Sequence, residues 1–135
     1  MTRGERNNNP LNIRRTADRW YGMSPEQTDR EFIVFVNLEY GIRAAIKLIR
    51  RYVQHYSCDS VRKIIYRWAP PCENDTESYI AYVTTKVGIM ESENIKHDDI
   101  KTICKIISAM AQVESQMKIP TEDIQRVWNN YFGSK

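Results

Sequence analysis

The sequence has 135 residues and lacks the features of a membrane-spanning, zinc-binding or disulfide-rich protein. No apolar run approaches the roughly 18 residues of a membrane-spanning helix, so we expect no membrane span. The three cysteines, Cys58, Cys72 and Cys104, are odd in number and have no Cys-x-x-Cys spacing. They therefore predict neither a zinc site nor a complete disulfide framework. At least one thiol is unpaired within the chain, which favours folding in a reducing compartment.

The sequence motifs of several enzyme classes are also missing. There is no glycine-rich phosphate loop and no Gly-x-Ser-x-Gly elbow, and no cysteine stands in a recognisable nucleophile setting. His55 and His97 are isolated from each other and from any metal-ligand pattern. Residues 1–10 contain no apolar core of the kind that a signal peptide has. We therefore expect no metal, no cofactor and no signal peptide.

The composition is typical of a globular protein with a mild basic excess. Hydrophobic residues make up 41% and charged residues 27% of the chain, which predicts one domain over residues 1–135 with a single core. The net charge is +3, from 20 basic and 17 acidic side chains. Basic residues crowd the N-terminus and residues 43–51. Because they form no recognisable binding motif, we expect no nucleic-acid partner.

Hydrophobic periodicity and capping residues predict helices over most of the chain after residue 37. The first expected helix covers residues 38–56 and is capped by Asn37, and the second begins at Asp59 or Ser60 and ends before Pro70. The third is capped by Asn74 or Asp75 and ended by Gly88. The fourth covers residues 98–117, and the last is capped by Thr121.

Residues 1–37 are rich in turn residues and predict short strands instead. Residues 11–13 are typical of a short strand. Residues 31–36 alternate, with Phe32, Val34 and Val36 on one face and Ile33 and Phe35 on the other. This pattern suits a strand that is covered on both sides. We therefore predict a mostly helical α+β domain with a small β-hairpin or sheet near its N-terminus.

A glutamate in the apolar stripe of the helix of residues 98–117 is the main functional candidate. At about 100° per residue, Glu114 lies within roughly 40° of Ile103, Ile107 and Met110, so it shares their inward face. Burial disfavours the charged form of a carboxyl group and raises its pKa towards neutrality, which is what a general acid needs. We therefore predict that Glu114 is a catalytic acid.

Two N-terminal features favour sugar binding. Asn8, Asn9 and Asn12 offer hydrogen bonds that suit the hydroxyl and acetamido groups of a sugar, although residues 7–14 alone are also typical of a plain turn. Trp20 offers a ring that can pack on a pyranose, although burial in the core is the commoner fate of tryptophan.

Taken together, these residues resemble phage virion structural proteins, which are related to the peptidoglycan-cleaving virion lysins. The resemblance runs from about residue 3 to residue 88. It rests on residues 3–14, Trp20-Tyr21-Gly22, Asp29, Phe32, Phe35, residues 40–44, residues 67–71, Glu73-Asn74, Thr76 and Tyr79. It implies virion assembly partners, and a protein made in the bacterial cytoplasm that is virion-associated or delivered to the periplasm and cell wall.

A more distant resemblance is to the lysozyme-like superfamily of soluble lytic transglycosylases, goose-type lysozymes and glucosaminidases. Glu73, Thr76 and Tyr79 are similar to a helix start near the end of transglycosylase domains. Residues 109–115 are similar to the catalytic helix of the family, whose Glu-Ser pair contains the general acid. In the glucosaminidases this helix precedes an asparagine-rich hairpin, whereas here the similar asparagine-rich residues 8–13 come first. The resemblance therefore implies a circularly permuted lysozyme-like domain.

The resemblance implies a peptidoglycan glycosidase of lysozyme or lytic transglycosylase type. Glu114 would protonate the bond between N-acetylmuramic acid and N-acetylglucosamine, and Glu73 is the next candidate acid. Tyr79 would orient the acid or the glycan, and the asparagines would bind acetamido groups. The alternative is a non-catalytic virion or cell-wall-binding protein in which Glu114 is a paired structural carboxylate.

Overall fold

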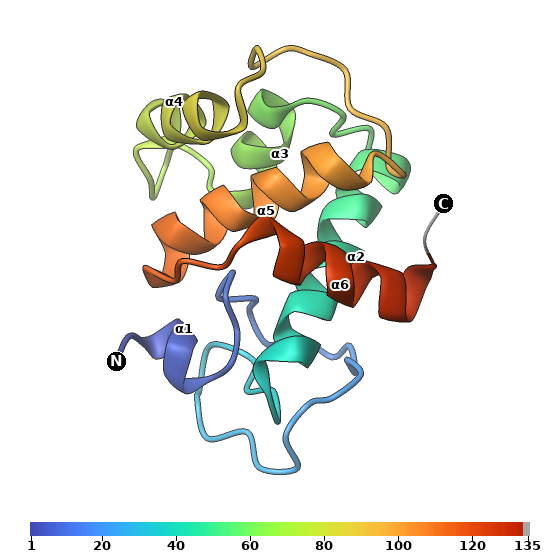
Figure 1. Cartoon of the computed structure of the whole chain (residues 1–135). Coiled ribbons are helices and arrows are strands. Elements are labelled where there is room, and N and C mark those ends of the chain that lie inside the picture. Colours follow the sequence, from blue (N-terminus) through green and yellow to red (C-terminus); the bar gives the residue numbers. More distant parts are fainter. Residues whose placement is uncertain (134–135) are drawn as a thin grey trace.

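The structure of the chain is a computed structural model that describes residues 1–133. These residues form six helices joined by loops (Figure 1). Their bounds are α1, Arg3–Arg6; α2, Leu38–His55; α3, Val61–Trp68; α4, Thr76–Val87; α5, Ile100–Ser115; and α6, Thr121–Phe132. None of these helices combines the length and the apolar character that crossing a membrane requires.

Most helix boundaries lie where the capping residues predict them. Asn37, Ser60 and Asp75 each accept a hydrogen bond from the backbone N–H three residues further on, at the starts of α2, α3 and α4. Gly88 ends α4 in the left-handed conformation, with φ of 81°. These predictions are therefore confirmed, because a capping side chain acts on its own helix turn and needs no tertiary partner.

Two of the expected boundaries are wrong. Thr121 does not cap α6, since the extended Pro120 occupies the cap position and Thr121 is the first helical residue. Helix α5 is shorter than residues 98–117: Asp99 caps it, and Gln116 ends it by adopting φ of 57°. The left-handed Gln116 turns the chain away from the helix axis, so the apolar stripe continues beyond the helix in an irregular segment.

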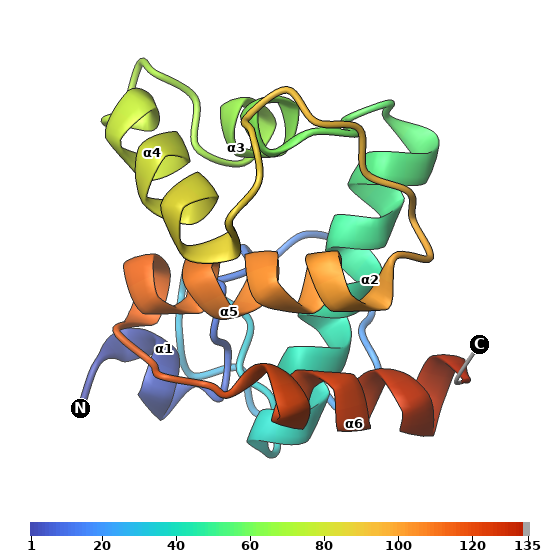
Figure 2. The ribbon, with the colours of Figure 1, turned by 45° about the horizontal axis from the view of Figure 1, so that its top comes forward.

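Helix α5 is the central element of the fold. It runs through the middle of the molecule in Figure 2 and contacts α1, α2, α4 and α6. Its fully buried side chains are Ile103, Cys104, Ile106, Ile107, Met110 and Ala111. These residues point to several sides of the helix, so neighbouring helices must cover it on more than one face.

The predicted N-terminal β-hairpin is wrong, and the chain is helical rather than α+β. Within the described residues, strand pairing in this region is limited to two isolated bridges, Arg14 with Phe32 and Met23 with Phe35. The side chain of Asn9 makes hydrogen bonds to the backbone that a neighbouring β-strand would make in a sheet. Its side-chain amide donates to the carbonyls of Ile13 (3.1 Å) and Ile33 (2.9 Å), and its oxygen accepts from the N–H of Ile13 (2.9 Å).

The alternation of residues 31–36 is real, but only one side of the segment is covered. Ile33 and Phe35 are buried in the core, whereas Val36 is 50% exposed. The backbone N–H of Phe35 donates to the carbonyl of Asn7, and the side-chain amide of Asn8 donates to the carbonyl of Phe35. The segment is thus a single extended stretch that is held by the asparagine turn.

The end of α5 anchors the N-terminal segment. The hydroxyl of Thr2 donates to the backbone carbonyl of Ser115 (2.7 Å), and the amide of Asn12 donates to the carbonyl of Glu114 (3.0 Å). The hydroxyl of Ser115 in turn donates to the carbonyl of Pro10 (2.8 Å). The last carbonyls of a helix have no partner within the helix, and here the N-terminal segment supplies donors for two of them.

The carboxylate of Asp29 joins the loop around residues 29–32 to the N-terminal residues by hydrogen bonds. The guanidinium group of Arg3 donates to both of its carboxylate oxygens, at 2.6 and 2.7 Å. The side-chain amide of Asn7 and the backbone N–H groups of Glu31 and Phe32 donate to the same carboxylate. These hydrogen bonds, chiefly that of Arg3, hold the pKa of Asp29 well below its ordinary value.

Asp29→Asn should reduce stability at neutral pH. A carboxylate whose pKa is lowered on folding stabilises the folded state above its ordinary pKa of 3.8, and this contribution disappears as the pH falls below that value. The unfolding free energies of wild type and variant, measured with urea over a pH series, should therefore converge in acid. Asp98→Asn removes an exposed carboxylate and serves as control. A difference independent of pH would contradict the role of Asp29.

Gly41→Ala should destabilise the protein by about 1–3 kcal/mol through overpacking. A Cβ atom at Gly41 would lie 1.9 Å from the backbone carbonyl oxygen of Asn8, which cannot rotate away. Alanine is the better helix former by about 1 kcal/mol, but this gain does not relieve the clash. Denaturant unfolding measures the change, and Lys47→Ala on an exposed face of α2 is the control. Unchanged stability would show that the N-terminal segment is not seated on α2.

Candidate functional site

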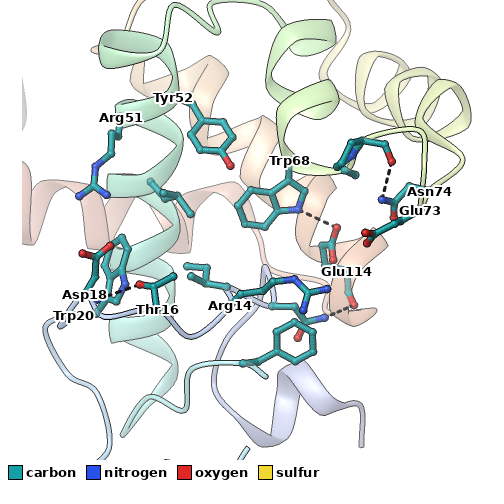
Figure 3. Close-up of a pocket in the computed structure, with 16 residues that line it drawn as sticks. Arg14, Thr16, Asp18, Trp20, Arg51, Tyr52, Trp68, Glu73, Asn74 and Glu114 are labelled. Atoms are coloured by element: carbon teal, nitrogen blue, oxygen red, sulfur yellow. Dashed lines mark hydrogen bonds between the residues drawn. The ribbon is translucent and has the colours of Figure 1, made fainter. Parts of the chain in front are cut away.

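A groove with a volume of about 440 Å³ lies between the N-terminal segment and the helices (Figure 3). It is bordered by residues 12–20, by α2, by the end of α3 with the loop that follows, and by the end of α5. The polar and aromatic residues that line it are Asn12, Arg14, Thr16, Asp18, Trp20, Phe32, Arg51, Tyr52, Trp68, Glu73, Asn74 and Glu114. The groove therefore combines aromatic surface with charges of both signs.

Glu114 lies in the last turn of α5, half-buried at the wall of the groove. The indole Nε1–H of Trp68 donates to its Oε2 atom at 3.0 Å, and the hydroxyl of Tyr79 donates to the same atom at 2.8 Å. No hydrogen bond from any residue among 1–133 reaches the other oxygen, Oε1. The two donors fix the carboxyl group through one oxygen and leave the second one for a ligand.

The pKa of Glu114 is raised above its ordinary value. Burial is the largest cause, and it outweighs the hydrogen bonds from Tyr79 and Trp68 and the positive charge of Arg14, which act in the opposite direction. Burial, together with the neighbouring Glu114, also raises the pKa of the Tyr79 hydroxyl, which therefore stays protonated and remains a donor. Glu114 can thus hold a proton at a higher pH than an exposed glutamate.

The connection between α3 and α4 sets the two donors on either side of the acid. Trp68 is the last residue of α3, and Pro70 and Pro71 prevent the helix from continuing. The buried hydroxyl of Thr76 donates to the carbonyl of Ala69 at 2.6 Å, which ties the start of α4 to the end of α3. Tyr79 follows within the first turns of α4 and reaches Glu114 from there.

The three asparagines, which form one group in the sequence, occupy different places in the structure. Asn12 lines the groove, and its buried side-chain oxygen Oδ1 has no hydrogen-bond partner within residues 1–133. Asn8 and Asn9 lie outside the lining, and their amides bind backbone carbonyls. Trp20 and Glu73 also line the groove, whereas Tyr79 stands behind Glu114.

Several lining residues were missed by the sequence analysis. Trp68 and Arg14 belong to segments that carry the phage resemblance, but that resemblance gives them no role, and Arg51 and Tyr52 lie in no motif. A usable signal existed for α2, because Leu48, Arg51 and Tyr52 stand at the spacing of one helix face. An arginine on such a face indicates a position where the helix borders a cavity or a partner rather than the core.

The described residues contain no group of three or more histidine, cysteine, aspartate or glutamate side chains that could hold a metal ion. All three cysteines are free: Cys58 and Cys104 are buried, and Cys72 is exposed in the loop between α3 and α4. The groups that line the groove are carboxyl, hydroxyl, amide, aromatic and guanidinium groups.

Comparison with known proteins points to a bacteriophage. No family model matches the chain. Over 116 residues it is 40% identical to Protein P5 of Pseudoalteromonas phage PM2, and the match covers 84% of this chain and 71% of that protein. This similarity supports the phage part of the expected resemblance. The match gives no support to the lysozyme-like part of the resemblance.

The raised pKa of Glu114 predicts a specific pH dependence of stability. A group whose pKa is raised on folding stabilises the folded state fully below its ordinary pKa of 4.5, and this contribution is lost as the pH rises through the raised pKa. Glu114→Gln stays neutral, so its stability relative to wild type should increase over that pH range. Urea unfolding at a series of pH values measures this, and parallel curves for the two proteins would contradict it.

Proposed function

This chain belongs to the same family as Protein P5 of Pseudoalteromonas phage PM2, and on that premise we propose that it is a phage virion-associated protein that cleaves the glycan strands of peptidoglycan. The similarity to a phage protein supports the phage part of this proposal, with virion assembly partners and arrival at the cell wall with the particle. The cleavage part is supported by one observation, the half-buried Glu114 carboxyl group that Trp68 and Tyr79 hold at the wall of the groove.

In the proposed reaction, Glu114 is the general acid. Its Oε1 atom carries the proton and donates it to the glycosidic oxygen between N-acetylmuramic acid and N-acetylglucosamine as the bond from that oxygen to the anomeric carbon breaks. The acetamido oxygen of the sugar attacks the anomeric carbon, as in substrate-assisted glycosidases. The carboxylate that remains keeps the hydrogen bonds from Trp68 and Tyr79, which strengthen when their acceptor becomes charged. Water or the 6-hydroxyl group then attacks the same carbon, opens the oxazolinium ring and gives its proton to the Glu114 carboxylate.

Substrate contacts follow from the groups that face the groove. Asn12 lines the groove, and we assign it to binding an acetamido group. The ring of Trp20 packs against a pyranose. Glu73 is the second candidate acid. We do not assign sugar binding to Asn8 and Asn9, because they lie outside the lining of the groove and their amides bind backbone carbonyls.

The second candidate function is that of a non-catalytic virion or cell-wall-binding protein. The comparison favours it over cleavage, because it relates the chain to a phage protein and to no glycosidase. In this case Glu114 is a structural carboxyl group. Its hydrogen bonds with Trp68 of α3 and Tyr79 of α4 would then serve to join those helices to α5, and they support this reading as well.

Release of muropeptides from purified sacculi separates the two functions. Wild type should release them, and Glu114→Gln should be slower by a factor of roughly 100 or more, because general acid catalysis contributes about that much. The rate of wild type should fall as the pH rises through the raised pKa of Glu114, since only the protonated acid reacts. Reducing ends in the products would indicate a hydrolase, and anhydro ends a transglycosylase.

Glu122→Gln, which removes an exposed carboxylate from α6, is the matched control and should retain full activity. Equal release by wild type and Glu114→Gln would remove Glu114 from the mechanism. If neither protein releases muropeptides but both sediment with sacculi, the binding function is the correct one.

A further inference from the structure

Two arginines stand at different points along the groove. Figure 3 shows Arg14 beside Glu114, whereas Arg51 lies towards Asp18 and Trp20. Each guanidinium group is stacked on an aromatic ring. That of Arg51 lies 5.5 Å from the centroid of Trp20, and that of Arg14 lies 5.2 Å from the centroid of Phe32. Stacking orients the guanidinium plane and leaves the N–H donors at its edge free to bind.

These arginines are poorly neutralised within the chain. The side chain of Arg51 makes no hydrogen bond or ion pair among the described residues. The contact of Arg14 with Glu31 is long, at 3.5 Å, and Glu31 also pairs with Arg3. Asp18 and Glu73 also line the groove, yet no ion pair joins either of them to an arginine there. Since the third acid of the groove, Glu114, is the one inclined to stay neutral, the groove offers two cations to an anionic ligand.

We infer that Arg14 and Arg51 bind carboxylates carried by the glycan, so that the groove selects peptidoglycan over uncharged amino-sugar polymers such as chitin. This inference rests on the proposed function and adds a basis for its substrate choice. The planar guanidinium fork matches a carboxylate with two parallel hydrogen bonds. Peptidoglycan carries such groups on the attached peptide, and on the lactyl ether of any muramic acid that has lost its peptide, whereas chitin has none.

The positions of the two arginines along the groove relate each bound carboxylate to a particular sugar of the strand. A carboxylate at Arg14 belongs to the sugar at the bond that Glu114 protonates, and a carboxylate at Arg51 belongs to a sugar further along the strand. Charged substituents on alternate sugars thus set the register of the glycan relative to Glu114. Arg14 and Arg51 are therefore specificity-determining residues, and neither transfers a proton.

Binding by the Glu114→Gln protein tests this without interference from cleavage. The three ligands are soluble peptidoglycan fragments with intact peptides, glycan strands from which an amidase has removed the peptides, and N-acetylglucosamine oligomers. Adding Arg51→Gln should weaken binding of the fragments roughly tenfold, the expected loss for hydrogen bonds to a charged group. Binding of the uncharged oligomers should not change. Arg14→Gln should show the same selectivity.

Arg19→Gln is the control, because Arg19 is exposed and does not line the groove. A melting temperature equal to that of the control shows that the variants fold. Weakening on the intact fragments alone assigns the peptide carboxylates as the ligand, and weakening on the stripped strands as well shows that the lactyl carboxylate freed by the amidase is also bound. Either result supports the inference.

Two outcomes overturn the inference, and they are distinguishable from each other. If Arg51→Gln and Arg14→Gln leave the binding of all three ligands unchanged, or weaken it equally for all three, carboxylate selection is overturned. The proposed function then still stands. Absence of binding to any of the three ligands by the Glu114→Gln protein overturns both.

Discussion

The contact between the N-terminal segment and the end of α5 is the constraint on which the site depends. A helix ends with carbonyl groups that have no partner within the helix, and a polar segment that brings donors to them docks there in one register. Thr2 and Asn12 supply those donors, and the hydroxyl of Ser115 returns a hydrogen bond to Pro10. A groove is formed because the segment then passes in front of Glu114 instead of pairing with itself.

The same docking determines the character of Glu114. One side of the carboxyl group meets Trp68 and Tyr79, and the other borders the groove, so the group is dry enough for burial to dominate its pKa and still reachable by a ligand. Full burial would make the proton of Glu114 inaccessible to a ligand, and full exposure would return the pKa of Glu114 to its ordinary range. This balance is a property of the assembled walls and of no single helix.

The helices could be predicted to a large extent from the sequence, and the N-terminal region could not. Helix caps such as Asn37 and Ser60 act within one turn, so local sequence is sufficient to place them. The alternation of residues 31–36 correctly indicates extended backbone, yet it does not reveal which groups form hydrogen bonds with that backbone. Asn9 takes the place of a neighbouring strand, and a side chain that replaces a ladder leaves no periodic signal.

The sequence by itself determined the helical periodicity, the caps and the inward position of Glu114, because each depends on residues within a few positions along one helix. Only the tertiary structure decided that Trp68 and Tyr79 converge on one oxygen of Glu114, that Asn12 faces the groove while Asn8 and Asn9 do not, and that Arg14 and Arg51 stand along it. These groups are far apart in the chain. Their meeting depends on how α2, α3, α4 and the N-terminal segment pack around α5, which no local pattern encodes.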